Sequence, residues 1–247
     1  MTGQTGLRRF VRPAAGGDVT QAPRPPAAAP LALSKEAVSA MGQLPGQRAA
    51  PGQQADAPER CELCANEVAL EHGHIADLQH ASLMCACRAC YLLFTQRSAG
   101  GGRFMAVPDR YLHDADRVMS PADWDQLEIP VGLAFFLRTS RDGGQLTGFY
   151  PSPAGVTECR LDLQLWDRLK ADYPLLGAPA DDVEAALISR SDDGVAYYLV
   201  PVDACYELAG RMRLHWQGFD GGAEARASIA AFLAEVRHRA RRFSPED

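Results

Sequence analysis

The stretch that decides the fold runs from Arg60 to Phe94, RCELCANEVALEHGHIADLQHASLMCACRACYLLF. It contains five of the seven cysteines and three of the six histidines of the 247-residue chain. Four of these cysteines form two C-x-x-C pairs, Cys61 with Cys64 and Cys87 with Cys90, separated by 22 residues. Two thiolates in a tight turn can bind one ion, and a second such pair completes a tetrahedral four-sulfur shell. The spacing therefore predicts a metal site at these four cysteines.

The residues between the two pairs predict a β-hairpin, the element by which a zinc ribbon brings two distant cysteine knuckles together. We expect strands at His74 to Leu78 and at Leu83 to Ala86, with a turn at Gln79 to Ser82. Zinc is the first choice of metal because it takes tetrahedral four-sulfur sites and needs no redox partner. Iron, in a rubredoxin-like site or an iron–sulfur cluster, uses the same ligands. Rubredoxin knuckles usually carry glycine and proline beside the cysteines, and CELC and CRAC do not.

Cys85 is the main ambiguity of the site. It lies two residues before Cys87, and residues two apart on a strand face the same side. Cys85 is therefore an alternative ligand, a reactive thiol beside the site, or a small buried apolar side chain. His72 and His74 point the same way if their segment is extended, and with His80 and Cys85 they are candidates for a second metal site. An exposed or supporting role for these histidines is the simpler expectation.

Composition and spacing divide the chain into an N-terminal tail, a metal module and a larger domain. Residues 1–58 are rich in Ala, Pro, Gly and Gln and lack sustained periodicity, which predicts a disordered N-terminal tail. Residues 59–98 form the expected zinc-ribbon-like metal module, and the glycine run Gly100–Gly102 is expected to be a flexible joint. Residues 103–242 predict an antiparallel-sheet domain with flanking helices, so the fold class is α+β.

Turn chemistry and periodicity place the elements of this last part. Two hairpins are expected around glycine-containing turns, and the helices follow from capping residues and apolar stripes. The expected strands are 103–107, 131–139, 145–150, 183–190, 195–200 and 211–216, and the expected helices are 120–127, 163–171, 203–209 and 223–241. The strand at 211–216 rests on clean alternation, with Met212, Leu214 and Trp216 on one face and basic residues on the other. The tail after residue 236 is expected to be solvated.

Charge and motifs exclude several classes of function. The net charge of −6 argues against nucleic acid as the main partner. No apolar run approaches the length of a membrane span, and no export signal follows the N-terminal arginines. Clustered C-x-x-C pairs favour metal over disulfides, so a cytoplasmic location is expected. The sequence contains no phosphate-binding loop, no G-x-S-x-G elbow and no H-E-x-x-H motif, so it specifies no catalytic residues.

The chain also resembles a known family. The run RCELC…EHGHIADLQHASLMCACRACYLLF, followed by GGRFMAVPDRY and LHWQGFDGG, is similar to an uncharacterised, mainly actinobacterial family over roughly residues 60–240. Members of that family are typically encoded beside the genes of high-affinity nickel–iron uptake hydrogenases. The resemblance carries no assigned activity. It implies a role in assembling, maturing or wiring a hydrogenase, with Cys61, Cys64, Cys87 and Cys90 as the matching metal ligands.

Three hypotheses follow. The first is a non-enzymatic accessory protein, in which a structural zinc ribbon anchors an α+β domain that binds a hydrogenase subunit or a maturation factor. The second is an electron-transfer protein that holds iron at the same four cysteines. The third is a zinc-ribbon regulator of transcription, which the acidic net charge and the absence of a recognition helix disfavour.

Overall fold

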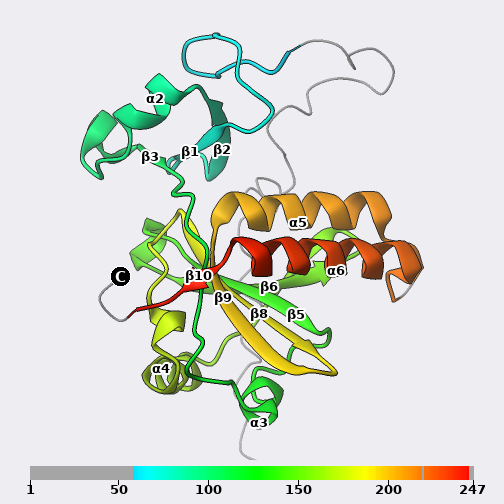
Figure 1. Cartoon of the computed structure of the whole chain (residues 1–247). Coiled ribbons are helices and arrows are strands. Elements are labelled where there is room, and N and C mark those ends of the chain that lie inside the picture. The colour runs from blue at the N-terminus through cyan, green and yellow to red at the C-terminus, as the bar shows by residue number, and fades with distance from the viewer. Residues whose placement is uncertain (1–57, 219, 245–247) are drawn as a thin grey trace, which may run out of the picture. The chain divides into compact units, whose positions relative to one another are not determined.

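The computed structural model describes residues 58–218 and 220–244, so almost all of the predicted disordered tail lies outside the described residues. The described chain contains a three-stranded sheet, in the order β2-β1-β3, and a seven-stranded sheet, in the order β10-β4-β9-β8-β5-β6-β7 (Figure 1). Their strand pairs are antiparallel except for β10 with β4. The predicted α+β class with antiparallel sheets and flanking helices is confirmed.

The small sheet contains the predicted hairpin. Its strands are β1 (Gly73–Asp77) and β2 (Ser82–Ala86), each within one residue of the prediction. The strand expected at residues 103–107 forms as β3 (Phe104–Ala106), but it pairs with β1 rather than joining the following sheet. The glycine run lies in a 3-10 turn, Ala99–Gly102, that leads into β3. The glycines therefore lie in the connection between α2 and β3, within the part of the chain that forms the small sheet. The predicted domain boundaries stay a prediction.

The large sheet is built on the two predicted hairpins, β5 with β6 and β8 with β9. The strand β7, which follows β6 and pairs with it, was not predicted. The strands of this sheet are β4 (Leu112–His113), β5 (Leu133–Arg138), β6 (Leu146–Ser152), β7 (Gly155–Cys159), β8 (Glu184–Ser191), β9 (Gly194–Pro201) and β10 (Arg241–Arg242).

Helices pack on both faces of this sheet. Side chains alternate along β5, so that Phe135 and Leu137 join one core cluster and Ala134 and Phe136 join another. The first cluster includes residues of α5 and α6, which run side by side in Figure 1, and the second includes residues of α3 and α4. The helices are α2 (Arg88–Leu93), α3 (Pro121–Asp125), α4 (Leu163–Asp172), α5 (Val202–His215) and α6 (Gly222–Arg239).

The helix α5 corrects two predictions. The chain does not leave the helix at Gly210, and the strand expected at residues 211–216 is the last part of α5 followed by its C-cap, Trp216. The reason is an apolar stripe at helical spacing, Cys205, Leu208 and Met212, that is fully buried against the sheet. A buried face of this length outweighs the weak helix propensity of one glycine. Asp203 lies in the first turn, and the N-cap is Pro201.

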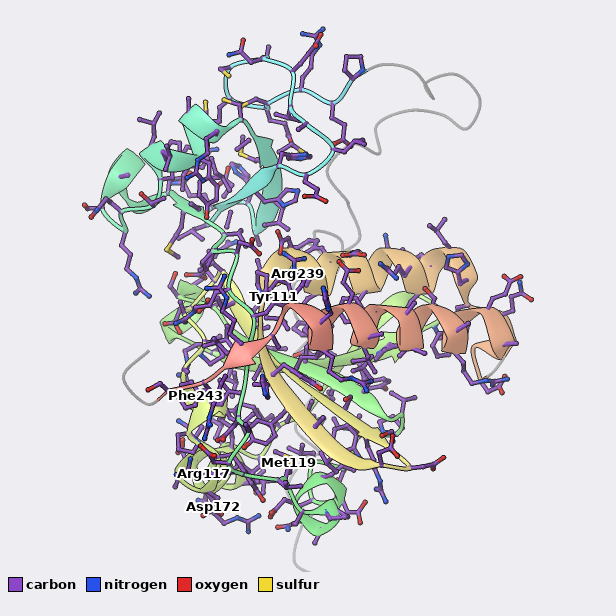
Figure 2. The ribbon with its side chains drawn as sticks, viewed as in Figure 1. Tyr111, Arg117, Met119, Asp172, Arg239 and Phe243 are labelled. Carbon is purple, nitrogen blue, oxygen red and sulfur yellow. The ribbon has the colours of Figure 1, made fainter. Side chains whose placement is uncertain are left out.

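The end of the chain is also more structured than predicted. After α6, Arg241 and Arg242 form β10 and pair in parallel with β4, and Phe243 packs on the second core cluster. The last turn of α6 places the Arg239 guanidinium 4.0 Å from the centre of the Tyr111 ring, and Figure 2 shows these two side chains together. The cation–π contact and the added strand hold the segment that was expected to be solvated.

Candidate metal centre

The first cysteine pair sits in a tight turn before the small sheet. The N–H of Cys61 donates to the carbonyl of Asn66 at 2.7 Å, and the N–H of Ala65 donates to the carbonyl of Cys61 at 2.8 Å. Ala65 takes a left-handed backbone conformation, with φ of 61°, which allows the turn to close. The turn buries Cys61 and leaves Cys64 exposed.

The second pair lies where β2 passes into α2. Cys87 is the N-cap of this helix, and Cys90 lies in its first turn. The helix begins before Cys90, at Arg88. The N-cap and the third helical residue lie at the same end of the helix, and the Sγ atoms of this pair are within 4.8 Å of each other.

The four cysteines of the two pairs come together. The Sγ atoms of Cys61, Cys64, Cys87 and Cys90, which we call the four-cysteine cluster, all lie within 4.8 Å of one another. The Sγ atoms of Cys64 and Cys87 are 3.6 Å apart. Two sulfurs bound to one tetrahedral zinc at about 2.3 Å would be separated by about 3.8 Å. The cluster could therefore hold one metal ion with little movement.

The protonation of the cluster is uneven. Burial raises the pKa of the Cys61 thiol, but hydrogen bonds from backbone N–H groups of both knuckles lower it to about 6 overall. Burial and the neighbouring thiols raise the pKa of Cys90. A thiolate is thus favoured at Cys61 before Cys90, and a bound cation would favour the deprotonated form of its ligands.

A second group of ligand atoms lies on the hairpin. One ring nitrogen of His72, one of His74 and the Sγ of Cys85 also lie within 4.8 Å of one another, and we call this the His–Cys cluster. The rings of His72 and His74 are 5.0 Å apart, as expected for an extended segment that points both the same way. The structure thus groups Cys85 with the histidines and Cys87 with the other cysteines.

The residues of both clusters lie in the part of the chain that matches the sequence model of a protein family. The sequence model of a family of unknown function, DUF5947, matches residues 60–240. The chain belongs to this family. The match agrees with the resemblance to an uncharacterised family, whereas the hydrogenase setting of its genes stays a prediction. No curated protein and no solved structure matches this DUF5947 chain.

His80 lies outside both clusters of the DUF5947 chain. Its Nδ1 is 2.8 Å from Oδ2 of Asp77, whose carboxylate also accepts from Arg103 Nη2 at 2.6 Å. This carboxylate is almost fully buried. His80 therefore helps to close the turn between β1 and β2 instead of offering a ligand to the His–Cys cluster.

Asp203 belongs to the site and was missed by sequence reasoning. Its Oδ2 lies 2.9 Å from Nδ1 of His74, across 129 positions of sequence. Burial lowers the pKa of His74, but Asp203 and Cys85 raise it to about 9. In the sequence Asp203 looks like an ordinary residue of a helix start, so no local signal connects it to the hairpin.

Two cysteines take no part in either cluster. Cys205 is buried in the first core cluster, and Cys159 is half-buried at the end of β7. None of the helices in the described ranges has the length and the apolar character that crossing a membrane requires.

Proposed function

We propose that this protein is a non-enzymatic metal-binding accessory protein that assists the assembly or maturation of a nickel–iron hydrogenase through protein–protein contacts. The observation that carries the proposal is the convergence of Cys61, Cys64, Cys87 and Cys90 at one end of the small sheet. Zinc is the proposed ion, because a closed set of four thiolates suits a structural zinc site. The hydrogenase setting is supported by the resemblance alone.

The core of the small sheet supports a structural role for the ion. One cluster of buried residues at this sheet consists of Ile75, Ala86, Cys61 and Cys90, and partly buried side chains that include Tyr91 and Phe104 pack against it. Two of its four buried members are thiols, so the cysteines form a large part of a small core. Metal binding by the cysteines would stabilise this core, because in small modules of this kind metal binding and folding are coupled.

A surface beside the four-cysteine cluster supports a protein partner. Leu92 and Leu93 lie at the end of α2, the helix that carries Cys90, and are 50% and 65% exposed. Contiguous exposed apolar patches mark sites of protein contact, and this pair would be part of such a patch. A bound ion would fix α2 and so fix the position of this pair.

The first experiment measures the metal content and the visible spectrum of protein purified without air. The proposal expects zinc in the four-cysteine cluster, a colourless protein and co-purification with a hydrogenase subunit or maturation factor. Cys61→Ser and Cys87→Ser should lose this ion, unfold the small sheet and abolish the co-purification, whereas Cys159→Ser should change none of the three. Native folding and partner binding in the metal-free Cys61→Ser variant would sink the proposal.

An electron-transfer protein is the second candidate, and the exposure of Cys64 favours it. A ligand thiolate at the surface brings an iron centre within reach of a redox partner. In that case the anaerobically purified protein would contain iron and show thiolate-to-iron charge-transfer bands. These bands would disappear in both cysteine variants and remain in the Cys159→Ser control.

A further inference from the structure

We propose that His72, His74 and Cys85 form a second metal site, which binds a divalent late first-row transition ion such as Zn²⁺ and leaves one coordination position open. One ligand atom of each side chain lies within 4.8 Å of the other two. The ladder between β1 and β2 places these residues together, because His74 is directly opposite Cys85 and His72 lies two residues before His74. This site is separate from the four-cysteine cluster and does not depend on the proposed accessory role.

The side chain of His72 is prepared for a ligand. Its Nδ1 is 2.8 Å from the carbonyl oxygen of Ala69, and a carbonyl only accepts, so Nδ1 carries the proton. The lone pair of the neutral ring is then on Nε2. The His72 side chain is 9% exposed, and its Nε2 is buried without a hydrogen-bond partner among the described residues. An unpaired buried nitrogen costs free energy, and a metal ion would satisfy it.

His74 has the arrangement that orients a metal-binding imidazole. Its Nδ1 lies 2.9 Å from the Asp203 carboxylate, which leaves Nε2 as the nitrogen for the cluster. Histidines that bind metals usually donate their second N–H to a carboxylate or a carbonyl, and the contact fixes the tautomer and the ring. His72 has such a contact with the carbonyl of Ala69, and His74 has one with the carboxylate of Asp203.

Cys85 is held in place through its backbone. Its N–H donates to the Glu62 carboxylate at 2.9 Å, and its carbonyl accepts from the N–H of Glu62 at 2.9 Å. Cys85 as a whole is buried, at 7% exposure. This double contact fixes the thiol opposite His74 while the chain continues to Cys87, so neighbouring cysteines of one segment supply two different clusters.

The ligand set determines the class of ion. Two imidazoles and one thiolate are of borderline softness and suit Zn²⁺, Co²⁺ or Ni²⁺ rather than Mg²⁺ or Ca²⁺. A tetrahedral ion would hold the two ring nitrogens and the Sγ atom about 3.3 to 3.6 Å from one another. They now lie within 4.8 Å, so side-chain shifts of about 1 Å would bring them to these distances. Three protein ligands leave a fourth position for water or another small ligand, in contrast to a closed structural site.

The test counts ions and identifies their ligands. Metal-free protein, reduced and kept without air, is titrated with Co²⁺, and bound cobalt is measured per chain. We expect two ions in the unaltered protein, one in His72→Gln and one in Cys85→Ala. The matched control His80→Gln alters a histidine of the same hairpin outside the cluster and should still bind two. Azide should shift the visible bands of the second ion only.

Three results would overturn the proposal. One is a single bound ion in the unaltered protein at excess Co²⁺, and another is two bound ions in both His72→Gln and Cys85→Ala. The third is loss of the four-thiolate cobalt spectrum in Cys85→Ala with its retention in Cys87→Ser, which would make Cys85 a ligand of the first site. Far-UV circular dichroism and the retained first ion show that the variants are folded.

Discussion

The carboxylate of Asp77 closes the turn between β1 and β2. It accepts hydrogen bonds from the backbone N–H of Gln79 at 3.0 Å and from Arg103 Nη2 at 2.6 Å, and it lies 2.8 Å from His80 Nδ1. Burial alone would raise the pKa of this carboxyl group, but the hydrogen bonds from Arg103 and His80 hold it well below its usual range. The folded small sheet therefore favours the ionised form of Asp77.

Asp77→Asn should lower the free energy of unfolding by about 1–2 kcal/mol at pH 7, because it removes charged hydrogen bonds to a partly exposed Arg103. The folded-state pKa is depressed, so this stabilisation is complete above the ordinary pKa of about 3.9 and is lost as pH falls toward the folded-state pKa. Urea unfolding of both proteins from pH 7 to pH 3 should show a difference that narrows below about pH 4. Asp220→Asn, at an exposed pair, should show little difference, and an Asp77→Asn difference that persists unchanged at pH 3 would contradict this account.

The elements of the fold differ in how far local sequence determines them. The hairpins β5–β6 and β8–β9 were predictable because glycine-containing turns separate apolar runs, and α3 because Ser120 caps it with Pro121 in the first turn. The helix α5 was predictable only in part. Apolar and polar residues alternate at 211–216, a pattern that is typical of a strand. The segment is helical because the apolar stripe at helical spacing is buried against the sheet, which the local sequence does not show.

The same limit applies to the site. The spacing of the cysteines was sufficient to predict the four-cysteine cluster, because each pair is local in sequence and the predicted hairpin between the pairs brings them together. Asp203 was not predictable, because a contact across 129 positions depends on how β1 and α5 pack. The strand β10 was not predictable either, because it also depends on a distant contact. A two-residue strand has no sequence pattern of its own and is defined by its pairing with β4.

Met212 and Leu214 provide a direct test of α5. In a strand both side chains would face the same side, but in the helix Met212 is fully buried and Leu214 is 72% exposed. Met212→Ala should therefore lower the free energy of unfolding by about 2–5 kcal/mol, and Leu214→Ala should change it by less than about 0.5 kcal/mol. Chemical denaturation measures both. Equal losses in the two variants would contradict the helix.

At the scale of the whole molecule, one ion pair joins the segment after β3 to the large sheet. Arg110 donates to both carboxylate oxygens of Glu184 at 2.8 and 2.7 Å, and the N–H of Ala180 donates to the same carboxylate at 2.8 Å. Glu184 begins β8 and is 1% exposed. The two parallel hydrogen bonds fix the chain where it passes from the small sheet to β4.

Arg110→Ala should lower the free energy of unfolding by about 3–5 kcal/mol, because it leaves the Glu184 carboxylate buried without its cation. Arg110→Lys should recover only part of this loss, since an ammonium group cannot form the paired hydrogen bonds. The control Arg226→Ala removes an exposed pair with Asp220 and should cost less than about 1 kcal/mol. Thermal and urea unfolding would measure all three, and equal stability of Arg110→Ala and Arg226→Ala would contradict this role.

The contact between His74 and Asp203 has a consequence for communication across the molecule. Asp203 lies in the first turn of α5, whose buried face packs in the core of the large sheet, while His74 belongs to β1 of the small sheet. Thermodynamic linkage is reciprocal: if a ligand bound to α5 changed the affinity of the proposed site at His74 by some factor, an ion at that site would change the affinity of α5 for its ligand by the same factor. A partner bound to the large sheet and an ion bound at the hairpin would then sense each other through a single imidazole.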